Sequence, residues 1–450
     1  MKNQTETETE WSRYRLDRDR HIKYWKRCAQ LLPEPYTSGD SNRMSFGFFI
    51  VAALDLLGAL ENETVVSTDE RQGWIEWIYG CQVPHTGGFR GFTGTVFGAM
   101  RTPQNWHWNP ANLPNTYFAL ATLVILGDDL SRVKVDECRN WVRGLQRPNG
   151  SFGEFVGEEG EVLGGDDPRL CLCAVGTLRI LQLVRRRRKE EDGDERKEEK
   201  EGLVGIDEEG LRRFIGNCQS HEGGIGQAPL LEAHSGLNYC GIATLSFLGM
   251  MQNPPASIQE MASQAGLDIE SCVRWMLDRQ TTWIDDDDED EDEDDEEDNV
   301  EDDDQDQKGD EDDKEKRHNG QADGRRPDER ILDLSSLKPG LTDNNNQELT
   351  AGFCGRCGKM ADTCYCFWNV GALAILQQHQ LVNVDALRRY LLGHVAHLVG
   401  GFGKAPGELP DLLHSYLGLA TLALYDESGL KEFDPTFCFS KDAVEKLKRH

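Results

Sequence analysis

The stretch richest in reactive side chains runs from Gly352 to Leu373 and reads GFCGRCGKMADTCYCFWNVGAL. It carries four cysteines, an aspartate, an arginine, a lysine and a tyrosine into the start of an apolar segment. The carboxylate of Asp362 and the thiol of Cys364, joined by the imidazole of His414, make a donor set suited to zinc. Three protein ligands leave a fourth position open, which is typical of a catalytic zinc site.

A closed structural zinc site is the alternative interpretation of the same stretch. Its ligands would be Cys354, Cys357, Cys364 and Cys366, but the six residues between the two cysteine pairs are fewer than in the usual zinc ribbon. A lone histidine such as His414 is also more often a core residue than a ligand. The spacing favours the open site and leaves the four-sulfur scaffold as a competing hypothesis.

A second group of polar residues is cationic or can donate hydrogen bonds. It consists of His234, Arg356, Lys359 and the hydroxyl of Tyr365. An arginine and a lysine three residues apart beside glycines are, on their own, typical of a solvated turn. Beside a metal and above an apolar cavity they suit a polyanion such as a diphosphate, which indicates a pocket for a prenyl diphosphate.

Both groups must be positioned by a repeat of apolar helices, each containing two small residues followed by leucine. The helices follow glycine-rich turns, of which the last two lie 49 residues apart, and amphipathic segments lie between them. A period of this size indicates a helical array, and apolarity on most sides indicates that these helices are buried. Six such pairs predict an all-α fold, an α6/α6 barrel, rather than an open solenoid. The repeated motifs are Ala52-Ala53-Leu54, Ala121-Thr122-Leu123, Gly176-Thr177-Leu178, Ala243-Thr244-Leu245, Gly371-Ala372-Leu373 and Ala420-Thr421-Leu422.

The unusual polar residues share one level of this repeat. In a barrel of parallel inner helices, equal register places residues on one rim, so a cation, an acid, a thiol and two histidines should converge at a single mouth. Seven to ten positions before the middle of each motif lie Ser45, Arg169, His234, Asp362, Cys364 and His414.

Composition sets the remaining limits. The net charge is −31, but residues 285–313 hold 23 acidic residues against one lysine, so the rest of the chain is unremarkable. This acidity argues against nucleic-acid or anionic-membrane binding by the whole surface. No apolar run reaches the roughly 18 residues of a transmembrane segment. Residues 1–20 lack the apolar core of a signal peptide, so we expect none there. We therefore expect a cytoplasmic protein with reduced cysteines.

The domain organisation follows from these patterns. We expect a single barrel domain over residues 11–440, interrupted by a charged insertion at 185–202 and an acidic insertion at 284–347. Both insertions have too little apolar surface to offset the entropy of ordering, so we predict that they are disordered.

The sequence resembles the β subunits of protein prenyltransferases, and within them the geranylgeranyltransferase type I class. That family has an Arg-x-x-Lys-x-x-Asp-x-Cys-Tyr-x-Phe-Trp pattern, found here from Arg356 to Trp368. Glu-Ala-His ending at His234 and Pro-Asp-x-x-His ending at His414 also match.

The resemblance implies a zinc-dependent enzyme that pairs with a helical prenyltransferase α subunit as a heterodimer. Its substrates would be geranylgeranyl diphosphate and proteins ending in a Cys-aliphatic-aliphatic-X (CaaX) box, often with X as leucine, such as Rho/Rac-type small GTPases. Zinc would be held by Asp362, Cys364 and His414. The diphosphate would be held by His234, Arg356, Lys359 and Tyr365.

The resemblance also suggests residues that set specificity. The resemblance places Ser45 at a position where farnesyltransferases have a tryptophan. Its small side chain would leave depth for a twenty-carbon isoprenoid, which would also contact Trp368 and Tyr117. Lys404 stands where the farnesyl and Rab enzymes have an aspartate that helps bind magnesium, so we expect catalysis without magnesium. Arg169, at the same rim, is a candidate for contacting the peptide end.

Several alternative functions remain open at this point. A β subunit of the farnesyl or Rab-type enzymes is the nearest of them, and Ser45 alone does not exclude the Rab type. A terpene cyclase of similar barrel type and the non-catalytic zinc scaffold are more distant, because the Asp-rich stretch lies within the low-complexity insertion.

Overall fold

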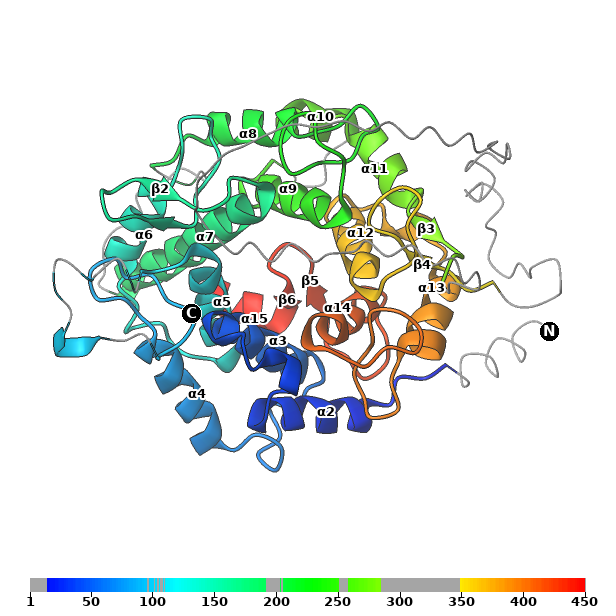
Figure 1. Ribbon diagram of the computed structural model, residues 1–450, viewed down its shortest axis with the longest axis horizontal. Coiled ribbons are helices and arrows are strands. Elements are labelled where there is room, and N and C mark those ends of the chain that lie inside the picture. The colour runs from blue at the N-terminus through cyan, green and yellow to red at the C-terminus, as the bar shows by residue number, and fades with distance from the viewer. Residues whose placement is uncertain are drawn as a thin grey trace, which may run out of the picture.

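The computed structural model describes residues 14–284 and 349–449, apart from 95–96, several positions between 101 and 109, 192–202, 204 and 251–257. Its helices form two concentric rings around one axis (Figure 1). The predicted acidic insertion at 284–347 lies, except for Ile284, outside the described residues.

The inner ring consists of six helices that are buried on nearly all sides. Each contacts the next along the chain, and the last contacts the first, so the ring is closed. This confirms the predicted α6/α6 barrel and excludes the open solenoid. In chain order the inner helices are α3 (Arg43–Leu56), α5 (Leu113–Leu126), α7 (Pro168–Glu191), α9 (Ser235–Phe247), α12 (Thr363–Ile375) and α14 (Leu412–Ala423).

Small residues allow the inner helices to approach closely. A Cβ atom at Gly176 would lie 2.5 Å from the ring of Tyr117 on the neighbouring helix, and one at Gly418 would lie 2.7 Å from the ring of Phe402. These distances are below van der Waals contact, so glycine is required where α5 and α7 meet.

The outer ring consists of more amphipathic helices that cover the inner one. The last of them continues into a single stretch of π-helix at Tyr390–Val395. A further helix, α10 (Ile258–Ala265), precedes α11. The outer helices are α2 (Arg18–Gln30), α4 (Thr68–Gly80), α6 (Val135–Gly144), α8 (Glu208–Asn217), α11 (Ile269–Leu277) and α13 (Val384–Arg389).

A recurring glutamine connects three of the units to the next one. The side-chain amide of Gln146 donates to the carbonyl of Asp207 at 3.0 Å and accepts from the amide of the same residue at 2.7 Å. Gln219 makes the same pair of bonds with Asp268, and Gln280 with Asn383. These partners cap the next outer helix, so the glutamines fix the spacing of the ring.

Two short pairs of antiparallel strands lie in the loops of the barrel. Strand β1 (Phe155–Val156) pairs with β2 (Val162–Leu163), and β3 (Gln280–Thr281) pairs with β4 (Gly352–Phe353). The acidic insertion is therefore placed between two paired strands, which preserves the repeat on either side of it.

The third pair of strands is a hairpin of β5 (Phe433–Asp434) and β6 (Phe439–Ser440). It closes the end of the barrel where the inner helices terminate. Three tyrosine hydroxyls from the inner ring donate to its backbone: Tyr117 to Phe437, Tyr239 to Pro435 and Tyr416 to Cys438. The final helix, α15 (Lys441–Arg449), packs on α5 and α7. Hairpin and helix fill the middle of the ring in Figure 1.

The charged insertion predicted from residue 185 does not begin there. Helix α7 continues to Glu191, and only the later part of 185–202 lies outside the described residues. Arg188 donates to the carbonyls of Leu130 and Ser131, which anchors this extension to the neighbouring repeat. The prediction of disorder is wrong for 185–191, because arginine, lysine and glutamate favour helix when such tertiary contacts exist. Within the described ranges, no helix is both long and apolar enough to cross a membrane.

Candidate functional site

The functional side chains lie at the amino ends of the inner helices. His234 caps α9, Asp362 caps α12 and Asp411 caps α14, each accepting a hydrogen bond from a backbone amide two or three residues further on. Helix amino termini carry free N–H groups and a partial positive charge. The predicted common register therefore corresponds to one rim of capped helix ends.

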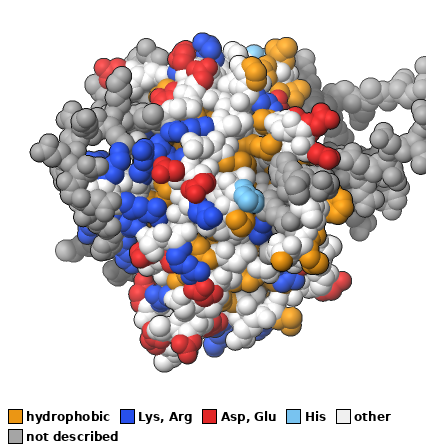
Figure 2. All heavy atoms as spheres, turned by 90° about the vertical axis from the view of Figure 1, so that its left-hand side faces the viewer, with side chains coloured by type: hydrophobic (Ala, Val, Ile, Leu, Met, Phe, Trp, Pro, Cys, Tyr) orange, Lys and Arg blue, Asp and Glu red, His pale blue; other side chains and the backbone are white. Residues whose placement is uncertain are grey.

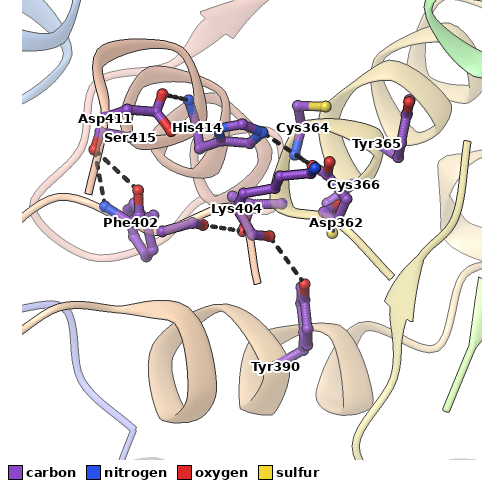
Figure 3. A network of polar contacts seen from close by, with 12 residues as sticks. Asp362, Cys364, Tyr365, Cys366, Tyr390, Phe402, Lys404, Asp411, His414 and Ser415 are labelled. Atoms are coloured by element: carbon purple, nitrogen blue, oxygen red, sulfur yellow. Dashed lines mark hydrogen bonds and ion pairs between the residues drawn. The ribbon is translucent and has the colours of Figure 1, made fainter. Parts of the chain in front are cut away.

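The rim brings together the three predicted metal ligands. One ligand atom from each of Asp362, Cys364 and His414 lies within 4.8 Å of the others, and this is the group of metal-binding side chains found in the described part of the chain. Asp362 and Cys364 are buried, and Asp362 Oδ1 lies 3.2 Å from His414 Nε2. Oδ1 also accepts from the amide of Cys364 at 2.7 Å, which fixes the carboxylate (Figure 3).

A second carboxylate orients His414. Its Nδ1–H donates to Asp411 Oδ2 at 2.5 Å, so Nε2 faces Asp362. Burial lowers the pKa of His414, but the hydrogen bonds to Asp362 and Asp411 outweigh it and raise the pKa to about 9. A carboxylate behind a metal-binding histidine holds its tautomer and increases its basicity.

The chemistry of this donor set fits zinc. A thiolate, an imidazole and a carboxylate are all zinc ligands, and three of them leave one coordination position. Burial raises the pKa of the Cys364 thiol well above its ordinary value, and the neighbouring Asp362 adds to the effect. A cation bound between them would favour the thiolate instead, so Asp362 and Cys364 are suited to a bound metal.

The structure does not assemble the alternative four-sulfur site. Cys357 is exposed, and the Sγ atom of the buried Cys366 lies 3.5 Å from the backbone oxygen of Asp362. In the described part of the chain, Cys354, Cys357, Cys364 and Cys366 do not come together as a metal-binding group. All thirteen cysteines of the chain are free thiols.

Next to the metal ligands, His234 and Tyr365 form a polar pair. His234 Nδ1 accepts from the amide of Gly236 at 3.0 Å, so the proton of the neutral ring is on Nε2, which lies 3.2 Å from the Tyr365 hydroxyl. Burial is the largest of the effects that lower the pKa of His234 to about 4; the charges of Arg356 and Arg169 add to it and that of Asp362 opposes it. His234 is therefore a neutral donor at physiological pH.

Tyr365 depends on a glycine of the central stretch. A Cβ atom at Gly355 would lie 2.2 Å from the Tyr365 ring, so no larger residue fits there. Burial raises the pKa of Tyr365 above its ordinary range, and the hydroxyl remains protonated.

Three cationic side chains come from the neighbouring loops, and the charge of Arg356 acts on both His234 and Tyr365. Arg356 is half-exposed and lies 3.8 Å from Glu232, whereas Lys359 and Lys404 are exposed. The backbone oxygen of Lys404 accepts from the amide of Thr363 at 2.9 Å, which ties this loop to the start of α12. Figure 3 shows the Lys404 side chain extending toward Asp362. All three side chains are exposed to solvent.

The residues predicted to line the isoprenoid site lie at different depths. Ser45 is in the first turn of α3 with its hydroxyl bonded to the Asn42 carbonyl, and Trp368 is partly buried 5.1 Å from the Tyr239 ring. Tyr117 is buried, and its hydroxyl is engaged with the closing hairpin. The structure therefore spreads these side chains from the rim to the floor of the barrel.

Arg169, the candidate for the peptide end, is at the rim but already engaged. Its guanidinium makes two contacts with Asp167, at 3.1 and 2.7 Å, and Asp167 also accepts from the Arg169 amide. The side chain is nevertheless 66% exposed, so its remaining N–H groups face solvent.

Sequence reasoning missed the role of Asp411. The residue belongs to the Pro-Asp-x-x-His match, yet an aspartate three residues before a histidine is read as an ordinary helix cap. The sequence did contain one indication of this role: the residue three positions after Asp411 is His414, a candidate metal ligand.

Known proteins resemble this chain in sequence and in fold. The family model for the prenyltransferase alpha-alpha toroid domain matches residues 16–439. Among curated proteins, the chain is 27% identical to the geranylgeranyl transferase type-1 subunit beta of Arabidopsis thaliana, covering 93% of this chain and 88% of the relative. It is also 27% identical to that of Dictyostelium discoideum, covering 96% and 97%.

A solved structure shows the same fold. It is the Candida albicans protein geranylgeranyltransferase-I complexed with GGPP, with a TM-score of 0.67, 22% identity and coverage of 97% of this chain and 99% of that one. The chain therefore belongs to the prenyltransferase alpha-alpha toroid family, in which it is similar to the β subunits of type I geranylgeranyltransferases.

Proposed function

We propose that this chain is the catalytic β subunit of protein geranylgeranyltransferase type I. It would transfer a geranylgeranyl group from geranylgeranyl diphosphate to the cysteine thiol of a C-terminal CaaX box. The observation that carries the proposal is the adjacency of two sites on one rim: a zinc-type donor set and a neutral, hydrogen-bonding pair flanked by cations. The names of the two relatives support the choice of isoprenoid.

Asp362, Cys364 and His414 would hold zinc, with Asp411 positioning His414. When bound, zinc lowers the pKa of the substrate thiol so that thiolate is present at neutral pH. The protein's contribution is to hold three ligands on two helix ends and leave one side of the site accessible to the peptide.

The second half of the rim would hold the diphosphate. As the bond between sulfur and C1 forms, the bond between C1 and the diphosphate oxygen breaks, and negative charge accumulates on the leaving group. His234 and Tyr365 would donate hydrogen bonds to it, and Arg356, Lys359 and Lys404 would balance its charge. The thiol proton is lost to solvent before transfer.

Lys404 supports a reaction that needs no magnesium, because a fixed ammonium group can neutralise the departing diphosphate. Ser45 supports selection of the longer isoprenoid by leaving room at the first turn of α3, with Trp368 and Tyr117 against the tail. Arg169 would contact the peptide end. The preferred proteins would end in CaaX with leucine, as Rho/Rac-type small GTPases do.

The partner required for activity would be a prenyltransferase α subunit, and the location would be the cytoplasm, where free thiols such as the thirteen here persist. Co-expression with a candidate α subunit, followed by transfer assays with farnesyl and geranylgeranyl diphosphate, tests the proposal. We expect zinc-dependent transfer of the twenty-carbon group to a CaaX peptide, with and without magnesium. Preference for the fifteen-carbon group would instead identify a farnesyltransferase β subunit. Transfer only to Rab proteins would identify the Rab-type enzyme.

A further inference from the structure

A second cationic site lies at the closed end of the barrel, away from the rim. A cavity of about 480 Å³ opens between α7, α15 and the closing hairpin. Lys and Arg side chains also gather on the side of the molecule that faces the viewer in Figure 2. One acidic residue, Glu190, lines the cavity, against the five cations Arg179, Arg186, Arg187, Lys448 and Arg449.

Arg186, Arg187 and Arg449 each make a contact that engages part of the guanidinium. Arg186 lies 3.4 Å from Glu190, Arg187 donates to the carbonyl of Asp129, and Arg449 pairs with Glu445 on its own helix. A guanidinium carries five N–H donors, so each such contact uses only part of it. Lys448 is exposed at the same cavity. Clustering like charges costs free energy unless an anion offsets it.

The floor of the cavity is apolar. Phe247 at the end of α9 and Phe437 in the hairpin are both buried and line it, and their rings lie 4.8 Å apart. Arg179 donates to the carbonyl of Phe247, which fixes that guanidinium beside the aromatic floor. The cavity therefore presents cations around its mouth and aromatic carbon at its base.

We propose that this cavity binds a compact ligand that carries several phosphate groups, as a free polyphosphorylated ring or as the headgroup of a phosphorylated lipid. Guanidinium forks match phosphate oxygens in pairs. The volume is that of a small-molecule pocket, and the apolar floor fits the face of a ring. The proposal does not depend on the proposed enzymatic function, because no residue of the rim contributes to the cavity.

Binding to the full chain is tested by calorimetry with inositol hexakisphosphate as the soluble probe. Vesicles of phosphatidylcholine containing phosphatidylinositol 4,5-bisphosphate test the lipid source, against phosphatidylserine vesicles of equal charge. We expect one site for the soluble probe that weakens as salt rises. Selective binding to the phosphoinositide vesicles in addition would identify the membrane headgroup as the source.

The decisive variant is Arg186→Gln with Lys448→Gln, which removes two exposed charges from the cavity. We expect the dissociation constant of the probe to rise about tenfold or more. The matched control is Arg274→Gln with Lys446→Gln. Arg274 is 66% exposed and lies 3.3 Å from a glutamate four residues away, as Arg186 is 68% exposed and lies 3.4 Å from one. Lys446 is an exposed lysine on α15 that does not line the cavity.

Four outcomes would overturn the proposal. They are equal losses in the variant and the control, equally tight binding of poly-glutamate, and loss of binding in Arg356→Gln, which would place the anion at the rim. The fourth is binding that occurs only after deletion of residues 285–313, which would make the chain's own acidic run the occupant.

Discussion

The Nδ1 atom of His414 lies 2.5 Å from Oδ2 of Asp411, and the two residues belong to the first turn of the same inner helix. Asp411 therefore has two tasks, since its other oxygen accepts from the His414 amide at 2.9 Å. One aspartate both begins α14 and aims the imidazole at Asp362.

Replacing Asp411 with asparagine separates the two tasks. Asparagine caps a helix as well as aspartate does, but it lacks the charge that raises the basicity of His414. We expect zinc affinity to fall by about tenfold or more, with an unchanged helix content of the zinc-free protein. Competition against a chromophoric chelator measures the affinity; an unchanged value would show that Asp411 is only a cap.

A pair of cysteine variants distinguishes the open zinc site from the four-sulfur scaffold. Cys354 and Cys364 are both buried and only ten residues apart. We expect Cys364→Ala to lose zinc and Cys354→Ser to keep it, as determined by metal analysis of the purified proteins. Metal loss in both cysteine variants would restore the scaffold hypothesis.

Asp362→Ala should also abolish transfer while prenyl diphosphate still binds.

The depth of the isoprenoid pocket is tested at Ser45. A tryptophan in the first turn of α3 would occupy space that the five extra carbons need, and each buried methylene contributes about 0.8 kcal/mol. We expect Ser45→Trp to shift the ratio of kcat/KM toward farnesyl diphosphate. Ser45→Ala is the control that keeps the volume small, and unchanged selectivity in the tryptophan variant would exclude a role for this position.

Magnesium dependence is tested at Lys404. Removing the ammonium group in Lys404→Ala should lower kcat on the order of a hundredfold, because one charge that offsets the leaving group is lost. Lys404→Asp should regain part of the rate when magnesium is added, whereas the alanine variant should not. Equal magnesium responses of the two variants would argue that Lys404 lies outside the diphosphate site.

A pH-dependent contribution to stability comes from His21 on α2. Its buried ring accepts from the Gly401 amide at 3.2 Å, and burial lowers its pKa to about 4, with Asp17 opposing and Arg20 adding to the effect. The unfolded chain binds this proton below about pH 6.5 and the folded chain does not. Stability is therefore present above pH 6.5 and is lost as the pH falls toward 4.

The size of this contribution is about 3 kcal/mol of unfolding free energy. Denaturant titrations of the wild type and of His21→Gln, whose amide oxygen can still accept from Gly401, should converge by that amount between pH 6.5 and 4. A difference that stays constant across this range would mean that His21 titrates normally in the folded state.

Local pattern was sufficient to predict the ring and the placement of its polar residues. The motifs of two small residues followed by leucine predicted helices that are buried on all sides. Each repeat places its inner helix in the same buried environment, so the same pattern recurs in every repeat. The position of Cys364 in its repeat predicted its place near His414 without any knowledge of the loops between them.

Contacts distant in sequence could not be predicted in this way. Tyr117 was predicted to line the isoprenoid pocket, and nothing in the sequence indicated that its hydroxyl is held by Phe437, which lies 320 residues further along. The helical state of 185–191 likewise depends on carbonyls of another repeat, such as that of Val133. Composition predicts only whether a segment folds in isolation, without contacts to other repeats.

The closing hairpin has a consequence for how the chain reaches its folded state. Helix α14 must meet α3 to complete the ring, and the tyrosines of three inner helices find their partners only in residues 435–438. A growing chain on the ribosome can therefore form helix pairs early but cannot complete these bonds until residues 435–438 have emerged. Contacts this distant in sequence make folding slow, so we expect closure of the ring to be a late step.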